Sequence, residues 1–498
     1  MHARARAVAL AGPQPHIVDL HATLAASGSE LPVDGLGSGV SRESRDRVRA
    51  AIRNAGFSWP DGVVHITAPA GQAGSDVDLA AAVAVLQLTE ATPVHRLATT
   101  AFVGELGLDG TVRPVPDVLT RAIAAAEAGV THLVIPASTA AEVTNVPGIT
   151  TVPVGCLADL VDWLHSGPAP ASVPRSGERA TASVWTSEVW GRVAPEAVRA
   201  AAAVAAGGHH VLHLSPPGTP ILLLPHVIRA LMADLTDPEA LEVSRWHSLA
   251  GEPLPGDGPH TRPPAESVHP SSTISSIVGS AGRPGLLTLA HRGVLTVEDL
   301  PECSARTVEA LRSALTDATV TVLGAGGNAS RPAGARIVFT ARDCPGRCVR
   351  VADCHCTAAQ RARYLARIPR WLVARTDLFV QQVTAATPDP SLPSLESVRD
   401  DVARARERAR RRWGAAPEPD AEAGYAQAVA GFPRDAVREL DDAIDWGQLS
   451  VRTATRCLRL AWTLADLDSR PHPSIDDLRT ILTSRQRASH LMRTPAPR

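Results

Sequence analysis

The pattern of apolar and polar positions over the first 165 residues mixes helical spacing with β-type runs. Apolar side chains at helical intervals predict two helices, and runs rich in β-branched residues predict two strands. The expected helices are residues 44–54 and 78–88, and the expected strands are residues 63–67 and 131–136. Asp109 and Gly110, between two further β-type runs, favour a tight hairpin turn. This region is therefore predicted to form an α+β domain.

Strand-like and helical runs alternate over the middle of the chain, as is typical of a parallel sheet covered by helices. The clearest strands are residues 211–214, 293–297 and 336–340. Proline, serine and glycine dominate a short segment before this region and predict a linker, and the last hundred residues are largely helical. We expect a multidomain α/β protein made of a first domain, a linker, a core and a helical C-terminal domain, at residues 1–165, 166–185, 186–385 and 386–498.

The composition excludes several chemistries because the chain contains no lysine: all 49 of its Lys+Arg positions are arginine. Arginine does not replace lysine as a Schiff base, as the activator of a catalytic serine or as the phosphate-gripping residue of a nucleotide loop. The net charge of −2 gives no overall preference for nucleic acid or membrane. The arginine-rich run 403–412 fits a phosphate-contacting surface or a solvated helix face with interspersed glutamate, and we favour the solvated face.

Membrane and export signals are not expected in this sequence. The apolar run near the N-terminus is broken at Gly12 and Pro13, and no later run reaches the length of about 18 apolar residues that a membrane span requires. The sequence therefore predicts a cytoplasmic protein without a membrane segment.

The apolar strand 211–214 leads into a turn and then a helix, which is the setting of a phosphate-binding loop. Such a loop follows the pattern G-x-x-x-x-G-K-[ST], in which backbone N–H groups, the lysine and the hydroxyl hold the phosphates and Mg²⁺. Ile221 and Leu222 stand where the lysine and the hydroxyl residue are required. The sequence therefore does not favour ATP and magnesium as cofactors. The residues of this altered loop are Ser215, Pro216, Pro217, Gly218, Thr219 and Pro220.

Four cysteines lie within thirteen residues, separated by polar, turn-forming spacers, in the segment 343–357. Four soft ligands in a reducing compartment favour a structural zinc ion, which would stabilise a short loop that has no core of its own. His355 is an alternative ligand, and four unligated thiols are the other interpretation. The predicted zinc ligands are Cys344, Cys348, Cys354 and Cys356.

Several motifs, in this order, resemble those of magnesium-chelatase-like AAA+ ATPases of the ComM/YifB family over about residues 37–489. The resembling segments are residues 41–52, 104–115, 206–209, 246–251 and 289–295. The resemblance implies a Lon-protease-like domain (of the ribosomal S5 domain 2 type), an AAA+ P-loop-type core carrying the cysteine-rich insertion, and a helical lid.

The resemblance also suggests roles for individual residues. Glu298 and Asp299 stand where the family's Walker B strand ends in Asp-Glu, so the pair is reversed, and Arg342 replaces the polar sensor asparagine. Arg375 occupies the position of the arginine finger, and Arg459 that of the second sensor arginine. Salt-bridged structural arginines are the alternative for both.

These departures lead to two functional hypotheses. The first is a non-hydrolysing scaffold or regulatory paralogue, for which enzymatic activity is not expected. It would form a homo-oligomer, or a hetero-oligomer with an active relative. The alternative is an ATP-driven motor that processes DNA, like a branch-migration helicase, with a divergent site; DNA is then a partner by resemblance. A Lon-like peptidase using Ser75 is disfavoured because there is no lysine to activate that serine.

Overall fold

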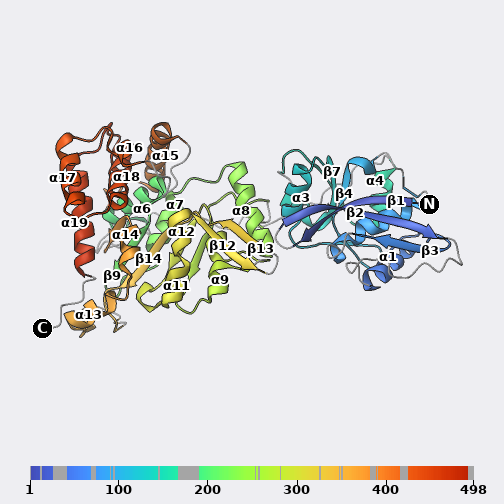
Figure 1. The fold of residues 1–498 in the computed structure, drawn as a ribbon, viewed down its shortest axis with the longest axis horizontal. Helices are drawn as coiled ribbons and strands as arrows, with labels where there is room; N and C mark the ends of the chain where they lie inside the picture. Colours follow the sequence, from blue (N-terminus) through green and yellow to red (C-terminus); the bar gives the residue numbers. More distant parts are fainter. Residues whose placement is uncertain are drawn as a thin grey trace.

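The computed structural model describes residues 2–11, 14–25, 42–68, 74–165, 190–381, 389–414 and 424–491, with short gaps inside these ranges. The gaps are residues 90, 93–95, 144–145, 253, 256–257, 281, 325–326, 347, 349–350 and 390. The predicted linker 166–185 lies outside the described residues. Figure 1 shows an elongated molecule in which the N-terminal sheet and its helices form one lobe and the rest of the chain forms the other.

The N-terminal lobe is built on a mixed six-stranded sheet in the order β3-β2-β1-β4-β7-β8. The long strands β1 and β2 pair antiparallel, and β4, β7 and β8 continue the sheet in parallel. The strands are β1 (His2–Ala11), β2 (Gln14–Ala25), β3 (Val63–Thr67), β4 (Thr100–Phe102), β7 (His132–Pro136) and β8 (Thr150–Val154). The helices are α1 (Arg42–Asn54), α2 (Asp78–Gln87), α3 (Val118–Glu127) and α4 (Leu157–Leu164). Both predicted helices and both predicted strands of this lobe are confirmed, and β1 and β2 were not predicted.

The predicted hairpin exists but has a different turn. Strands β5 (Glu105–Leu106) and β6 (Val112–Arg113) pair antiparallel. The connection is longer than the two-residue turn that we expected. It closes through a hydrogen bond from the backbone N–H of Gly107 to the carbonyl of Thr111 at 2.8 Å, and Gly110 has a φ of +83°.

The middle of the chain forms a five-stranded sheet in the order β10-β11-β14-β9-β15, and every pairing in it is parallel. The three strands predicted here are confirmed as β11, β14 and β9. The strands are β9 (Val211–Ser215), β10 (Ala265–Val268), β11 (Val294–Val297), β14 (Arg336–Arg342) and β15 (Leu378–Val380). A separate hairpin consists of β12 (Thr319–Gly324) and β13 (Gly327–Pro332).

Alternate side chains of this sheet pack into two different cores. Val211 and Val338 face helices α6, α7 and α15, while Leu212 and Phe339 face the layer that contains α9 to α14. The alternation follows from the strand period of two residues, and apolar residues on both faces are typical of a parallel sheet buried between helices. The helices of this region are α6 (Pro195–Gly207), α7 (Leu223–Leu231), α8 (Asp237–Leu249), α9 (Ile274–Val278), α10 (Leu286–Leu289), α11 (Ala305–Ala310), α12 (Arg312–Asp317), α13 (Ala358–Leu365) and α14 (Arg370–Arg375).

The C-terminal region is helical, as predicted, and packs back onto the middle of the chain through α15 and α18. The arginine-rich run lies on α15, and its arginines are not all solvated: Arg412 pairs with the buried Asp466 at 2.7 Å and lies 3.8 Å from the centre of the Trp462 ring. The expectation of a solvated face therefore holds for only part of the run. The helices are α15 (Leu395–Trp413), α16 (Tyr425–Val429), α17 (Arg434–Asp445), α18 (Val451–Leu467) and α19 (Ile475–Leu491). Within the described ranges, no helix has the length and apolar character needed to cross a bilayer.

Candidate functional site

The carboxyl ends of β9, β11 and β14 meet at one edge of the parallel sheet, where ligands bind in folds of this type. Two hydrogen bonds join the strand ends. The backbone N–H of Asp343 donates to the carbonyl of Ser215 at 3.0 Å, and the backbone N–H of Asp299 donates to Oγ1 of Thr340 at 3.2 Å. The loop after β9 and the carboxylates after β11 therefore lie at the same edge of the sheet, with the end of β14 between them.

The loop between β9 and α7 has few groups that could hold a phosphate. Pro216, Pro217 and Pro220 have no backbone N–H to donate. The N–H of Thr219 is used inside the loop, where it donates to the carbonyl of Pro216 at 3.3 Å. Leu222 is 39% exposed at the start of α7, so an apolar side chain faces solvent where an anion-binding helix would present a polar one.

His213 lies in β9 just before this loop and was missed by the sequence reasoning. It is completely buried, and among the described residues neither ring nitrogen has a hydrogen-bond partner. Burial lowers the pKa of His213 to about 4, so the ring is neutral at pH 7. A histidine inside an otherwise apolar strand was the available signal.

One of the two carboxylates predicted at the end of β11 lies near an arginine side chain. Glu298 and Asp299 follow the last residue of the strand, and Asp299 adopts a left-handed backbone with a φ of +42°. Nε of Arg342, the last residue of β14, lies 3.9 Å from Oδ1 of Asp299. At this distance the guanidinium balances part of the carboxylate charge beside the loop.

The two arginines predicted from the resemblance lie away from this loop within the chain. Arg375 ends α14 just before β15, at the amino edge of the sheet, and its guanidinium lies 5.7 Å from the centre of the Trp371 ring. Arg459 is buried in α18. Arg456 and Thr463, one turn to either side of Arg459, contact residues of the same amino edge. The two edges are separated by the length of β9, which is about 16 Å for its five residues.

A buried ionic network that the sequence did not predict holds the amino edge together. The carboxylate of Asp377, 4% exposed, accepts hydrogen bonds from the backbone N–H of His210 at 2.9 Å and from Nη1 of Arg456 at 3.3 Å. Burial opposes its ionisation, but Arg456 and His209 outweigh burial and hold the pKa of Asp377 below its usual range. The network joins β9, β15 and α18.

The four predicted zinc ligands are brought together by the structure. Their sulfur atoms all lie within 4.8 Å of one another, just beyond the carboxyl end of β14. Four thiolates 2.3 Å from a tetrahedral zinc ion lie about 3.8 Å apart, so the donor set and its spacing fit this metal. Gly346 leaves room for the sulfurs, because a Cβ there would lie 2.9 Å from Sγ of Cys356 and 3.2 Å from Sγ of Cys348.

The electrostatics of the cluster favour a thiolate at one position. The backbone N–H of Cys356 lowers the pKa of the Cys354 thiol to about 7, and Arg361 adds to this effect by donating to its sulfur at 3.2 Å. Burial and the neighbouring sulfurs raise the pKa of Cys348 to about 12. A divalent cation would bind all four sulfurs as thiolates, and Arg361 would then be a partner of the ligand sulfur.

Comparison with known proteins covers nearly the whole chain. Family models described as "Subunit ChlI of Mg-chelatase", "Magnesium chelatase, subunit ChlI" and "Magnesium chelatase, subunit ChlI C-terminal" match residues 21–139, 187–389 and 393–485. The uncharacterized protein Rv2897c of Mycobacterium tuberculosis is 36% identical over 97% of this chain and 98% of its own length. YifB of Escherichia coli is 30% identical over 91% of this chain and 90% of its own.

Competence protein ComM of Haemophilus influenzae is 27% identical over 92% of both chains. The order of elements around the parallel sheet, the matches to all three ChlI models and the full-length similarity to YifB agree with one another. The chain belongs to the magnesium-chelatase ChlI-like family of AAA+ proteins that includes YifB and ComM.

Proposed function

We propose that this protein is a non-hydrolysing member of its family that acts as a scaffold or regulatory subunit in an assembly of AAA+ modules. The observation that carries the proposal is the loop between β9 and α7, with three prolines and with Ile221 and Leu222 at its end. Phosphoryl transfer depends on a cation at the β/γ-phosphates and a hydroxyl on Mg²⁺. The loop supplies neither, so we take it to be a degenerate Walker A motif.

The carboxylates after β11 support the same conclusion. Walker B function needs one carboxylate to order the Mg²⁺ shell and the other to polarise water, and the Glu298-Asp299 order exchanges the two side-chain lengths. A displacement of about 1 Å in such groups costs on the order of 100-fold in rate. Arg342 beside Asp299 adds a fixed positive charge that competes with Mg²⁺ for that carboxylate.

Assembly is the activity that the remaining features support. Arg375 lies toward the edge of the sheet opposite the loop, so in a packed assembly it would serve a neighbouring subunit and not its own. Arg459 is buried in α18 and would support this edge from within the chain. We propose that this chain offers an edge containing Arg375 to a second copy or to a catalytically active relative. We further propose that the N-terminal lobe is a Lon-protease-like domain without peptidase activity, and that zinc bound by the four cysteines stabilises the end of β14.

Nucleotide binding and hydrolysis test the proposal directly. Calorimetric titration with ATP, with and without Mg²⁺, should show no Mg²⁺-dependent binding, and phosphate release should stay at background. The combined substitution Pro220→Gly, Ile221→Lys and Leu222→Ser should restore affinity before it restores hydrolysis, since Glu298 and Asp299 remain exchanged. A turnover of about 1–100 s⁻¹ by the unmodified protein would refute the proposal and support the ATP-driven motor instead.

A further inference from the structure

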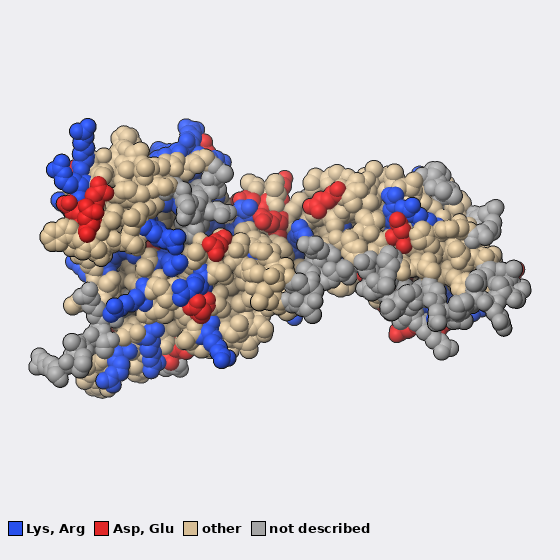
Figure 2. Space-filling view, in the orientation of Figure 1, with Lys and Arg blue, Asp and Glu red and all other residues tan. Residues whose placement is uncertain are grey.

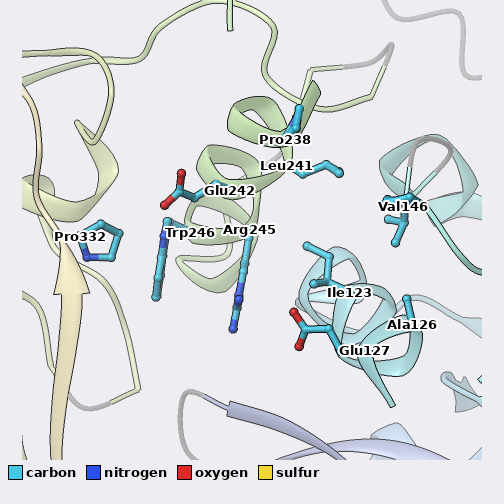
Figure 3. A pocket seen from close by; sticks show the side chains of 11 residues that line it. Ile123, Ala126, Glu127, Val146, Pro238, Leu241, Glu242, Arg245, Trp246 and Pro332 are labelled. Carbon is cyan, nitrogen blue, oxygen red and sulfur yellow. The ribbon is translucent and has the colours of Figure 1, made fainter. Parts of the chain in front are cut away.

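A cavity of about 590 Å³ lies between the two lobes, where α3 of the N-terminal sheet domain faces α8 of the middle region (Figure 3). Its walls are mainly apolar, and they come from both lobes: Ile123, Ala126 and Val146 on one side, and Leu241, Trp246 and Pro332 on the other. Volumes of this size and apolar linings with a few polar groups are typical of small-molecule sites, which often lie at domain junctions.

Two charged side chains of opposite sign face this cavity from opposite helices. Arg245 projects from α8 and Glu127 from the end of α3, as Figure 3 shows. No ion pair joins them in the described structure. Nε of Arg245 is buried and has no hydrogen-bond acceptor among the described residues, and its guanidinium lies 5.5 Å from the centre of the Trp246 ring. A desolvated donor without an acceptor is unfavourable, so a bound acceptor would satisfy it.

The third charged residue of the cavity is already neutralised. Glu242 lies 3.4 Å from the ring of His291 and 2.6 Å from Nε of Arg292. The nearby ring of His291, together with Arg292, lowers the pKa of Glu242 to about 2. Within the part of the chain that the structure describes, no carboxylate pairs with Arg245 on the α8 side, and the exposed Glu127 is the separate negative group of the α3 side.

We propose that this cavity binds a small molecule with a flat apolar body, an anionic group that pairs with Arg245 and a hydrogen-bond donor that faces Glu127. The flat body packs against Trp246 and the aliphatic wall of α3. Such a ligand contacts both lobes at once and stabilises their present arrangement. This inference is independent of whether the protein binds ATP.

The helix that carries Arg245 is also connected to the base of β11. Glu239 and Glu242 of α8 hold Arg292 through contacts of 2.8 Å and 2.6 Å, and Arg292 has a φ of +61° just before that strand. Glu298 and Asp299 follow the other end of β11. An occupant of the cavity therefore stabilises the helix that anchors the strand leading to the candidate site.

Fluorescence titration of the full-length protein with 8-anilinonaphthalene-1-sulfonate tests the site, because this probe combines aromatic rings with a sulfonate. We expect saturable binding of one probe per chain. Arg245→Gln should weaken it about tenfold, the value expected for one charge-assisted hydrogen bond. Glu127→Gln should strengthen it, because glutamine removes the charge that repels the sulfonate and keeps a carbonyl oxygen that accepts from the anilino N–H of the probe. The matched control Arg306→Gln, at an exposed arginine outside the cavity, should change nothing.

The uncharged analogue N-phenyl-1-naphthylamine separates charge recognition from apolar adsorption: its affinity should be the same in the unmodified protein and in Arg245→Gln. Binding of the sulfonate that is not saturable, or that Arg245→Gln leaves unchanged, would overturn the proposal. It would also be overturned if Arg245→Gln and Glu127→Gln shifted the affinity in the same direction. That result would mean that the two side chains pair with each other and do not contact the ligand separately. Trp246→Ala provides a second variant and should weaken both probes.

Discussion

Removing the carboxylate of Asp377 should destabilise the junction between the parallel sheet and the C-terminal helices. In Asp377→Ala the backbone N–H of His210 loses its acceptor at 2.9 Å, and Arg456, 6% exposed, keeps its charge without the carboxylate at 3.3 Å. Breaking a buried pair by removing one partner costs about 3–5 kcal/mol, because the other charge stays desolvated. Asp377→Asn keeps an acceptor for His210 and should cost less, about 2 kcal/mol.

Urea unfolding followed by tryptophan fluorescence measures this cost, because Trp462 lies in the helix that Asp377 anchors. Glu439→Gln is the matched control: it breaks the exposed pair with Arg479 and should leave the midpoint unchanged. The pKa of Asp377 is lowered in the folded protein, so its contribution is present above the unfolded pKa of about 4 and is lost as the pH falls through the folded value. The part of the loss that comes from the contact with Arg456 should therefore be constant from about pH 5 to pH 8.

A loss below about 1 kcal/mol in Asp377→Ala would refute this reasoning, because an exposed pair costs no more than that. A coupling between Asp377 and Arg456 that changes steadily between pH 5 and pH 8 would also contradict it, since neither side chain titrates there. In a double-mutant cycle with Arg456→Met, the two losses should not add, because both single variants remove the same contact between Asp377 and Arg456.

Three further predictions concern the other sites. Protein purified without chelators should contain about one zinc per chain by metal analysis; Cys354→Ser with Cys356→Ser should remove it, Gly346→Ala should lower the occupancy because of its 2.9 Å contact with Cys356, and retention of metal by the serine variant would contradict the site. Because the pKa of His213 falls to about 4 on folding, this residue should cost the protein stability as the pH drops from about 6.5 to 4, by up to about 3 kcal/mol, and His213→Leu should make the dependence shallower in pH-resolved unfolding without removing it, since the pKa values of His210 and His260 are also lowered by burial; an unchanged profile would show that His213 is not buried neutral. Mixing the protein with an active relative should change the relative's ATPase rate, and Arg375→Ala should remove the effect; a protein that stays monomeric and leaves that rate unchanged would contradict the scaffold proposal.

The sequence predicted those parts of the fold that depend on local patterns. Strands such as β9 and β11 are short apolar runs between turns, and the four sulfurs are close in sequence, so their approach in space needed no long-range information. The strand β1 was missed although Ala3 and Ala5 are buried and Arg4 is exposed, because alanine contrasts weakly with its neighbours in hydrophobicity.

Contacts between distant segments could not be predicted in this way. Arg456 and Asp377 are 79 positions apart, and a single sequence does not indicate which buried side chains form an ion pair. The same holds for the cavity between α3 and α8, since these two helices are more than a hundred positions apart in the sequence. The position of the loop after β9 could be predicted, because strand, turn and helix signals are local. The contact of Arg342 with Asp299 could not, because it depends on the order of strands in the sheet.

Strand β14 connects the sulfur cluster directly with the candidate site at the carboxyl edge of the sheet. Cys344 follows Asp343, whose N–H is bonded to Ser215, and Asp343 follows Arg342, which faces Asp299. Loss of order at the cysteines would therefore unfold β14 from its carboxyl end. The hydrogen bond from Asp343 to Ser215 would break first, and the contact of Arg342 with Asp299 would be lost next. A chelator or a thiol oxidant would therefore perturb the candidate site without binding to the loop after β9. Its effect should appear as faster amide exchange at Asp343 before any global unfolding.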